Sequence, residues 1–460
     1  MAKCTTTQKQ RNYTSRAPLV APGIKLSQLG ISRPITEWVQ IAQKVVKYAP
    51  VEKLMDALIT ILAGARGLVE ANKRVRPDRA LQRAFGRDSC AEQSVISDTL
   101  DASTPENVEQ MQQAMEEIYQ HHSAGYRHKY EQSLQLLDID MTGQPCGSKA
   151  AFATKGYFAK QRNRRGRQLG RVLATWYQEV VMDRLYDGKA QLPRAFQELV
   201  LAAEDVLDLD RQKRQRTILR MDGHGGSQGD VNWALEQGYH VHTKEYSTQR
   251  TRTFAETVVT SHDDPKIPGR QVGWVTAEPT EYVRPVKRIA VRTRKKNGQW
   301  GIGVLISTVP EEEIGLLARM PARQGQDPLA ILLAYVYFYD LRAGGVETEI
   351  KEDKQGLGIT KRDKKRFEAQ QMIVQLNALA HNLIVWSRRW LAQMWDKIER
   401  LGIMRMIRDV FHLSGLVHFR SNGSIERITL HQADPFSSGL CAGLPPLLAP
   451  LHVAVNLGEF

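Results

Sequence analysis

The first third of the chain follows a helical repeat of apolar and polar positions. Between about residues 34 and 130, apolar side chains recur every three or four positions, which predicts amphipathic helices that bury one face. Thr104 and Pro105 stand where a helix cap and a first-turn proline are typical. The helices are expected at 34–49, 51–65 and 104–120.

Two parts of this region allow a further interpretation. Residues 1 to about 30 are polar and rich in Thr, Pro and Gly, so we expect a poorly ordered arm. Residues 88–102 could form the short helix of a helix-turn-helix that faces a DNA groove, or an ordinary bundle helix, and both interpretations stay open. We therefore predict an arm and a helical, DNA-binding domain over residues 1–130.

After residue 130 the pattern changes to strands and helices. Strand-like apolar runs at about 134–143, 168–178 and 179–190 precede a helix, a strand, a helix and a last strand. Such an order gives a mixed sheet flanked by helices. It is the element order of the ribonuclease H-like fold, an α/β class, and we place its first part at 131–243.

Residues 244–326 have polar, β-branched and alternating positions. A hairpin with an Asn-Gly turn is expected at 288–308. We interpret this segment as a β-rich insertion and not as a continuation of the α/β unit. Helical patterns resume over 327–415, the second part of the α/β domain, and residues 416–460 hold a possible hairpin and a Pro/Leu-rich tail.

One strand-like run carries two acidic residues on a single face. In "LLDIDMTGQP" (136–145) side chains alternate, so Leu137 and Ile139 point one way while Asp138 and Asp140 point the other. If the strand is central, this acidic face needs a partner, because an unpaired buried carboxylate is costly.

Composition narrows the function classes. The 460 residues suffice for two or three domains, and 42% hydrophobic residues fit a soluble globular protein. The net charge of +14 favours a polyanionic partner, although a membrane surface or plain solubility would fit it too. Four cysteines without CxxC spacing predict neither a disulfide framework nor a zinc site. We expect no signal peptide, no membrane span and a cytosolic location.

Three acidic residues are expected to meet at one edge of the predicted sheet. Asp140 lies in the first strand and Asp222 ends the fourth, its neighbour in a ribonuclease H-like sheet, while Glu347 begins a helix after the insertion. Close carboxylates raise one another's pKa unless cations neutralise them. Mg²⁺ prefers such oxygens and takes up phosphates, so two Mg²⁺ ions, or Mn²⁺ in their place, are the expected cofactors for a displacement at phosphorus.

At these residues the chain resembles a known family. The "DxT" of "DIDMTG", the "RMDGHGG" around Asp222 and "YDLRAGGVETEIKEDKQGLG" (339–358) together resemble the DDE transposases of bacterial insertion sequences. The resemblance covers roughly residues 130–395 and includes a β-rich insertion between the second and third acids. Each motif alone is weak, whereas their order is fairly specific.

The family's tyrosine, arginine, glutamate, lysine signature can be read onto Tyr339, Arg342, Glu347 and Lys354. The arginine and glutamate are separated by one residue more than the family usually has, which keeps Glu349 as a rival third ligand. Asp138 is expected to lie behind the ligands or at a solvated edge, because the "DxT" match selects Asp140.

The resemblance implies a transposase that binds the inverted-repeat ends of an insertion sequence. Such an enzyme hydrolyses the DNA strand at the ends and joins the freed 3′-OH to target DNA by two-metal-ion catalysis. It works as a dimer in a synaptic complex, in the bacterial cytoplasm and on the nucleoid when bound to DNA, without a membrane.

DNA-binding candidates come from the signature and from basic stretches near the acids. Lys351 and Lys354 would share a helix side with Glu347, or form ordinary surface pairs. Basic side chains would contact phosphates without reading sequence, while solvated loops and core packing are the alternatives. The candidates are Arg342, Lys354, Lys351, Tyr339, Arg162, Arg164, Arg165, Arg167, Arg292, Arg294, Lys295 and Lys296.

Two other functions remain open at this point. A non-catalytic DNA-binding protein derived from a transposase would keep the fold without cleaving, although the intact acids argue against it. A related ribonuclease H-like nuclease would cut DNA without joining it.

Overall fold

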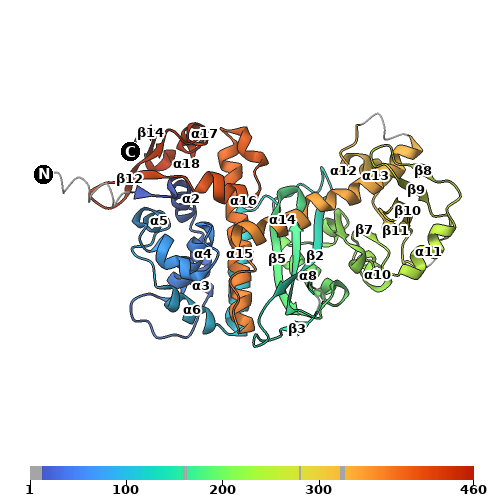
Figure 1. Ribbon diagram of the computed structural model, residues 1–460, viewed down its shortest axis with the longest axis horizontal. Helices are drawn as coiled ribbons and strands as arrows, with labels where there is room; N and C mark the ends of the chain where they lie inside the picture. The colour runs from blue at the N-terminus through green and yellow to red at the C-terminus, as the bar shows by residue number, and fades with distance from the viewer. Residues whose placement is uncertain (1–12, 157, 159–160, 162, 279–280, 322–326) are drawn as a thin grey trace. The chain divides into compact units, whose positions relative to one another are not determined.

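The computed structural model describes residues 13–156, 158, 161, 163–278, 281–321 and 327–460, and the chain divides into two compact units (Figure 1). We call residues 1–123, 144–154 and 349–460 the helical unit, and residues 124–143 and 155–348 the sheet unit. Both units combine segments that are far apart in the sequence. The predicted divisions at 130, 243, 326 and 415 therefore do not coincide with the unit boundaries.

The predicted arm is wrong for the part that the structure describes, because α2 (Ala17–Gln28) is a largely buried helix. Pro18 lies in its first turn, where a missing N–H costs nothing. A Cβ on Gly23 would lie 2.6 Å from the ring of Phe85, so glycine allows the helix to pack closely there. The Pro and Gly content that suggests disorder thus serves close packing.

The predicted helix over 34–49 is also wrong beyond its first turns. α3 (Ser32–Trp38) ends early, and no helix follows before residue 50. The backbone of Gln40 is instead bound by side chains: its N–H donates to Gln110 Oε1 (2.8 Å), and its C=O accepts from Asn107 Nδ2 (2.9 Å). These tertiary hydrogen bonds replace helical ones.

The other expected helices of this region are confirmed, and Thr104 caps its helix by accepting from the N–H of Asn107 (3.3 Å). Ser97, in the segment that allowed a helix-turn-helix, contacts Lys364 Nζ (2.6 Å), which favours an ordinary bundle helix. The helices are α4 (Pro50–Leu62), α5 (Arg79–Ala84), α6 (Gln93–Asp101) and α7 (Pro105–His122).

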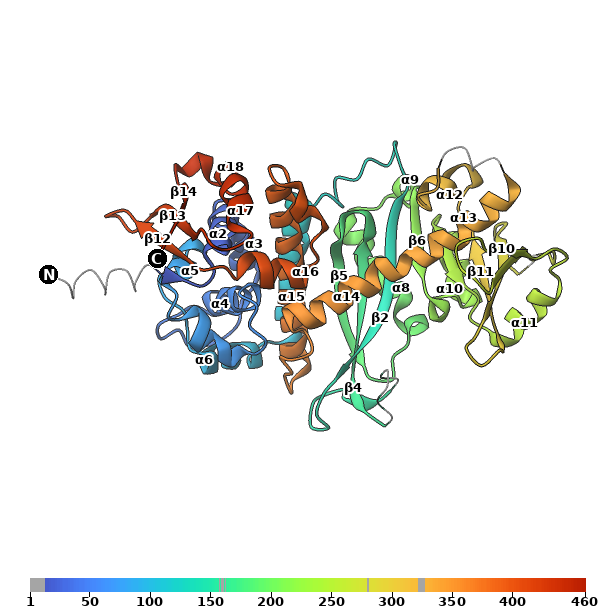
Figure 2. The same cartoon turned by 45° about the horizontal axis from the view of Figure 1, so that its top comes forward.

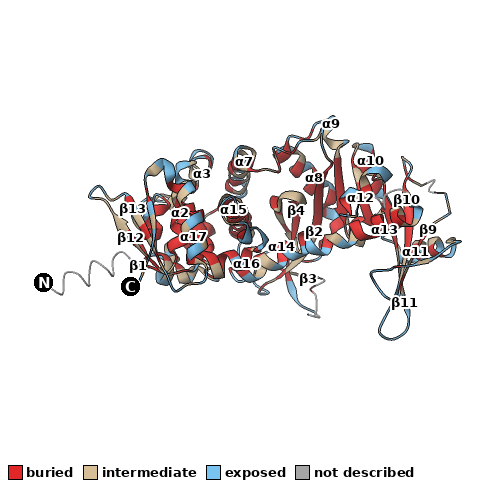
Figure 3. Cartoon of the chain, turned by 90° about the horizontal axis from the view of Figure 1, so that it is seen from above, coloured by how far each residue is buried: buried red, intermediate tan, exposed pale blue. Residues whose placement is uncertain are grey.

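The core of the helical unit surrounds α15 (Phe367–Ala392), in which every residue from Ala369 to Arg388 is buried (Figure 3). A helix that is buried all round is typical of the centre of a helical domain. The C-terminal hairpin is confirmed and belongs to a small sheet in the order β1–β12–β13–β14. Its strands are β1 (Tyr13–Thr14), β12 (Gly415–Phe419), β13 (Ile425–His431) and β14 (Ala454–Gly458).

The sheet unit is built on the five predicted strands, in the spatial order β5–β4–β2–β6–β7. β2 pairs with β6 and β6 with β7 in parallel, while β4 and β5 are antiparallel. The first and fourth predicted strands are therefore neighbours, as expected. The strands are β2 (Gln135–Pro145), β4 (Arg165–Ala174), β5 (Glu179–Asp187), β6 (Thr217–Met221) and β7 (His240–Lys244).

The separate insertion that we predicted is corrected by the pairing of β11 with β7, which is antiparallel with Leu305 opposite Lys244. The segment continues the same sheet, because its hairpin covers the free edge of β7. The hairpin itself is confirmed, and Gly298 takes the positive φ (+80°) of its turn. The added strands are β8 (His262–Asp263), β9 (Arg270–Trp274), β10 (Lys287–Arg294) and β11 (Trp300–Ser307).

Helices flank this mixed sheet (Figure 2). α8 packs against β4 and β5, α10 against β7, α11 against β11, and α13 against β9 and β10. By length and composition the helical stretch 328–357 could cross a membrane, but 56% of its most apolar window is buried inside the protein, as in a core helix. The bounds are α8 (Leu192–Leu207), α10 (Gln228–Glu236), α11 (Thr248–Glu256) and α13 (Pro328–Asp340).

Candidate active site

The acidic face of β2 finds its first partner on the neighbouring strand. Asp138 lies directly opposite Arg220 of β6. The guanidinium donates two hydrogen bonds to the carboxylate, Nε to Oδ1 (2.6 Å) and Nη2 to Oδ2 (2.8 Å), and a third to the C=O of Phe338 (2.6 Å). Both side chains are fully buried. Asp138 is therefore part of an internal ion pair, and its predicted place at a solvated edge is wrong.

Asp140, two residues further on the same face, contacts a different cation. Arg342 Nη2 lies 3.1 Å from Asp140 Oδ1, and Arg342 Nη1 donates to Glu347 Oε1 (2.5 Å). The arginine is buried, whereas the Glu347 side chain is half exposed. Two of the three predicted acids thus meet on one guanidinium.

A break between two helices places Arg342 and Glu347 in this arrangement. α13 ends at Asp340, a short 3₁₀ turn (Leu341–Gly344) carries Arg342, and α14 (Val346–Glu352) starts immediately before Glu347. A Cβ on Gly345 would lie 2.6 Å from Asp138 Oδ2, so glycine is required where this break meets the Asp138–Arg220 pair.

Asp222 follows β6, beside the end of β7. Its C=O accepts a hydrogen bond from Thr243 Oγ1 (3.0 Å). The glycines after it allow a very close turn, since a Cβ on Gly226 would lie 1.6 Å from the C=O oxygen of Lys244. The turn therefore holds Asp222 against the end of β7.

Electrostatics connect the three acids. The pKa of Asp140 is raised to about 6, mainly because the carboxyl is buried; Arg342 opposes this rise, and the negative charges of Asp222 and Glu347 add to it. Burial by itself would lower the pKa of Arg342, but the surrounding negative charges, that of Asp140 first, hold it above the ordinary arginine value. The site therefore combines a carboxyl that resists ionisation with a permanently charged arginine.

Tyr339 and Lys244 lie beside this group. The Lys244 ammonium is 4.4 Å from the centroid of the Tyr339 ring, a cation–π distance. Burial raises the pKa of Tyr339, so the phenol stays neutral. Burial and the charge of Arg342 lower the pKa of Lys244, while Asp340, Asp222 and Glu347 raise it. Lys244 was not singled out from the sequence, and its place at the end of the strand after Asp222 is the signal that could have identified it.

The rival ligand Glu349 lies in the helical unit, where it is buried and its Oε2 is 3.9 Å from His381 Nε2. His381 also contacts Asp353 (2.8 Å). The regular spacing that we predicted for Glu347, Lys351 and Lys354 is wrong at its end, because α14 changes into a π-helix over Asp353–Leu357. Glu347 is a better candidate than Glu349 for the third ligand, because it shares Arg342 with Asp140. Its role as a ligand stays a prediction.

The basic candidates separate into exposed and buried ones. Arg167 is buried on β4, opposite Asp187, so it is not available to a DNA phosphate in this structure, and that assignment is corrected. Arg292 is half buried and donates to the C=O of Ala255 (2.7 Å). Arg162 lies outside the described residues. The exposed candidates are Arg164, Arg165, Arg294, Lys295, Lys296 and Lys351, and Lys354 is partly exposed.

The carboxylate oxygens of the three acids suit Mg²⁺, but the side chains are not arranged as a metal site in this structure. Asp140, Asp222 and Glu347 offer the hard oxygens that Mg²⁺ prefers, and the raised pKa of Asp140 reflects a carboxyl that a cation would stabilise. Among the described residues, no three His, Cys, Asp or Glu side chains are grouped closely enough to hold a metal ion. The cation that Asp140 and Glu347 contact is Arg342.

Comparisons with known proteins add a similarity to solved structures. No model of a protein family matches the chain, and no curated protein matches it. Among solved structures, the chain is similar to a piggyBac transposase in a synaptic complex with hairpin DNA, determined by cryo-EM. The similarity covers 86% of this chain and 80% of that chain, at 12% sequence identity and a TM-score of 0.43.

Proposed function

We propose that the chain is a DNA transposase of the bacterial insertion-sequence type, with a ribonuclease H-like catalytic sheet. The observation that supports this most is the convergence of Asp140 and Glu347, from segments far apart in the sequence, on the Arg342 guanidinium. The effect of Asp222 on the pKa of Asp140 joins the third acid to them. The reaction would be hydrolysis of a DNA strand at the element's end, followed by joining of the 3′-OH to target DNA.

The residues divide the work of such a reaction. Asp140, Asp222 and Glu347 would hold two Mg²⁺ ions, or Mn²⁺, which supply Lewis-acid stabilisation of the oxygens at the reacting phosphorus. Arg342 would exchange its carboxylate contacts for the DNA phosphate, for which its fork of donors is well suited. Its Nε is buried and has no hydrogen-bond partner among the described residues, so it would gain an acceptor if the phosphate displaced the side chains that cover it.

The partners would be the inverted-repeat ends of the element and target DNA, both double-stranded. Arg164, Arg165, Arg294, Lys295 and Lys296 are exposed and would contact phosphates. We also propose that the protein acts as a dimer in a synaptic complex. It would act in the bacterial cytoplasm, on the nucleoid.

The test is an assay of the purified chain on a plasmid that carries the DNA ends flanking its gene, with Mg²⁺ or Mn²⁺. Wild type should nick the ends and produce joined products. Asp140→Asn, Asp222→Asn and Glu347→Gln should each lower the rate by about a hundredfold or more, as the loss of a charge that stabilises a transition state does. Glu256→Gln, on an exposed glutamate of α11, is the matched control and should retain full activity.

The other outcomes are equally informative. Full activity in Asp222→Asn would refute the proposed group of acids. Activity in Glu347→Gln, with loss in Glu349→Gln, would transfer the third ligand to Glu349. Cleaved ends without joined products would identify a nuclease that cuts only.

One observation favours a second candidate, a DNA-binding protein that does not cleave. Arg342 already neutralises Asp140 and Glu347, and the described acids do not form a group of three that could hold a metal. Specific binding to the element's ends without cleavage in either metal would support this candidate.

A further inference from the structure

A groove lies beside the candidate active site, on the added part of the sheet. It has a volume of about 520 Å³ and is formed by the end of β7, the start of α11, and strands β10 and β11. Its lining includes three cations, Lys244, Arg252 and Lys295, and no carboxylate. Threonine hydroxyls and the half-exposed ring of Trp300 complete much of the wall.

The three cations differ from other basic side chains of the sheet unit in their contacts with acidic residues. Among the residues that the structure describes, the side chains of Lys244, Arg252 and Lys295 form no ion pair or hydrogen bond. Other basic side chains nearby do so: Arg250 pairs with Glu281 (2.7 Å), and Lys287 lies 3.6 Å from Glu311. Unpaired cations that share one groove attract an anion from outside.

Lys244 connects this groove to the acids. It lines the groove, and its ammonium lies over the ring of Tyr339, three residues before Arg342 in the sequence. Burial lowers the pKa of Lys244, and the charges of Asp340, Arg342, Asp222 and Glu347 also act on it, so its ammonium lies within electrostatic range of the proposed site. An anion that contacts Lys244 would therefore also be next to the carboxylates.

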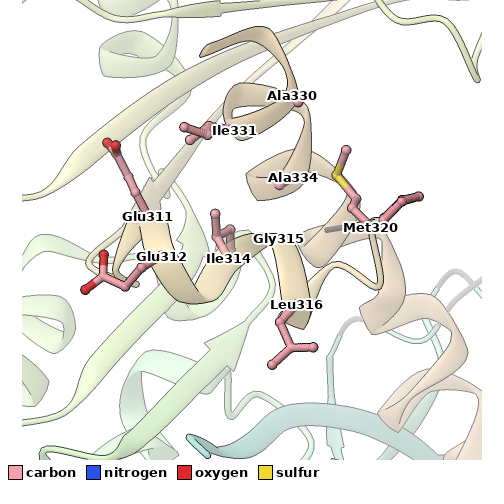
Figure 4. A pocket seen from close by; sticks show the side chains of 10 residues that line it. Glu311, Glu312, Ile314, Gly315, Leu316, Met320, Ala330, Ile331 and Ala334 are labelled. Atoms are coloured by element: carbon pink, nitrogen blue, oxygen red, sulfur yellow. The ribbon is translucent and has the colours of Figure 1, made fainter. Parts of the chain in front are cut away.

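The volume and lining distinguish this groove from a second cavity in the sheet unit. That cavity, of about 250 Å³, lies between α12 (Glu311–Leu317) and α13 and is lined by apolar side chains, with Glu311 and Glu312 at one side (Figure 4). Its acids would repel a phosphate. The groove next to Lys244 combines positive charge, hydroxyl donors and proximity to the acids.

We propose that this groove binds the phosphodiester backbone of the DNA strand that enters the active site, and that Lys244 contacts the phosphate nearest the carboxylates. Arg252 and Lys295 would bind the following phosphates of the same strand. The inference rests on the proposed function only in naming the bound strand as the one that is cleaved. The groove and its unpaired cations are observed independently of that function.

Lys244→Met and Lys295→Met test the proposal, with Lys287→Met as the matched control. All three variants remove one positive charge, but Lys287 lies on β10 outside the groove. Binding of a fluorescently labelled DNA duplex to the full chain is measured by anisotropy over a range of NaCl concentrations. Each groove variant should lower the slope of log K against log salt by about 0.9, the value for one lost phosphate contact. The control should leave the slope unchanged.

A second measurement places Lys244 at the reacting strand. With Mg²⁺, Lys244→Met should cleave DNA about tenfold or more slowly at saturating DNA, as expected for a lost hydrogen bond to a charged group, and Lys244→Arg should recover most of the rate. Lys295→Met should weaken binding and leave the saturated rate near that of wild type. Circular dichroism and the thermal midpoint establish that each variant is folded, and Lys244→Gln replaces the methionine variant if that one does not fold.

Failure of the groove proposal and failure of the proposed function would give different results. A salt slope in Lys244→Met and Lys295→Met equal to that of wild type refutes the groove, even if the wild type cleaves DNA. A reduced slope in a protein that never cleaves supports the groove and contradicts the proposed function.

Discussion

The ion pair between Asp138 and Arg220 gives the sharpest test of the structure. Replacing Arg220 with methionine keeps most of the apolar volume but leaves a buried carboxylate without its cation. The two side chains are 1% and 0% exposed, and two hydrogen bonds of 2.6 and 2.8 Å join them. Removing one partner of such a pair costs about 3–5 kcal/mol, so we expect the free energy of unfolding of Arg220→Met to fall by that amount.

A double-mutant cycle measures the interaction energy between Asp138 and Arg220 apart from their interactions with the surrounding residues. Asp138→Leu combined with Arg220→Met replaces the ion pair by apolar side chains, which is often nearly neutral, so the coupling energy should be about 2 kcal/mol or more. Urea unfolding followed by far-UV circular dichroism measures all four proteins. Arg184→Met is the matched control, because Arg184 forms an equally short ion pair with Glu198 (2.7 Å) but both side chains are exposed, and it should cost less than about 1 kcal/mol.

Two results would refute this reasoning. Arg220→Met could cost no more than Arg184→Met, or the double variant could be no more stable than the less stable single one. Either result would mean that Asp138 does not depend on Arg220 in the folded protein.

Three further predictions concern the same sheet edge. Gly345→Ala should destabilise the protein and reduce DNA cleavage, because its Cβ would lie 2.6 Å from Asp138, whereas Gly344→Ala, with nothing within 4 Å, should do neither in thermal unfolding and cleavage assays. Gly226→Ala should lower the melting temperature strongly because its Cβ would overlap the backbone of Lys244, whereas Gly229→Ala, in open space on α10, should leave it equal or higher. Burial and the charge of Arg220 lower the pKa of His242 to about 3, so protons bind the unfolded chain first as the pH falls below about 6.5. The free energy of unfolding should therefore fall by about 2 kcal/mol between pH 8 and pH 5 in urea titrations, and His242→Leu should remove that part of the pH dependence.

The sequence predicts those parts of the fold that depend on local pattern. The strands of the sheet, the capped helix at Thr104 and the hairpin at Gly298 follow from periodicity and turn chemistry. The errors fall where tertiary contacts override local preference. α2 is helical because its buried face packs against neighbouring elements such as α5. The chain around Gln40 is not helical because α7 side chains bind its backbone.

Which basic residues are buried could not be predicted from how many of them stand close together in the sequence. Arg167 stands in a cationic stretch and is therefore a natural candidate for a phosphate contact, but β5 places Asp187 opposite it. The same strand pair sets Asp183 opposite Arg171, where the guanidinium donates two hydrogen bonds (2.8 and 2.7 Å) to the carboxylate. Strand register decides which arginines are exposed, and register between β4 and β5 is not visible in the charge pattern.

The same argument explains why two aspartates on one face of β2 have different surroundings. β6 reaches far enough to place Arg220 opposite Asp138, but its pairing with β2 ends at Ile139 and Met221, so β6 places no residue opposite Asp140. The cation that Asp140 contacts comes from the break after α13, in the form of Arg342, which Glu347 shares. Arg220 is carried by the neighbouring strand, whereas Arg342 is carried by a short turn between two helices. Asp138 is therefore suited to structure, and Asp140, where the pairing of β6 with β2 has ended, is the carboxylate that under the proposed function would exchange its partner for a metal ion.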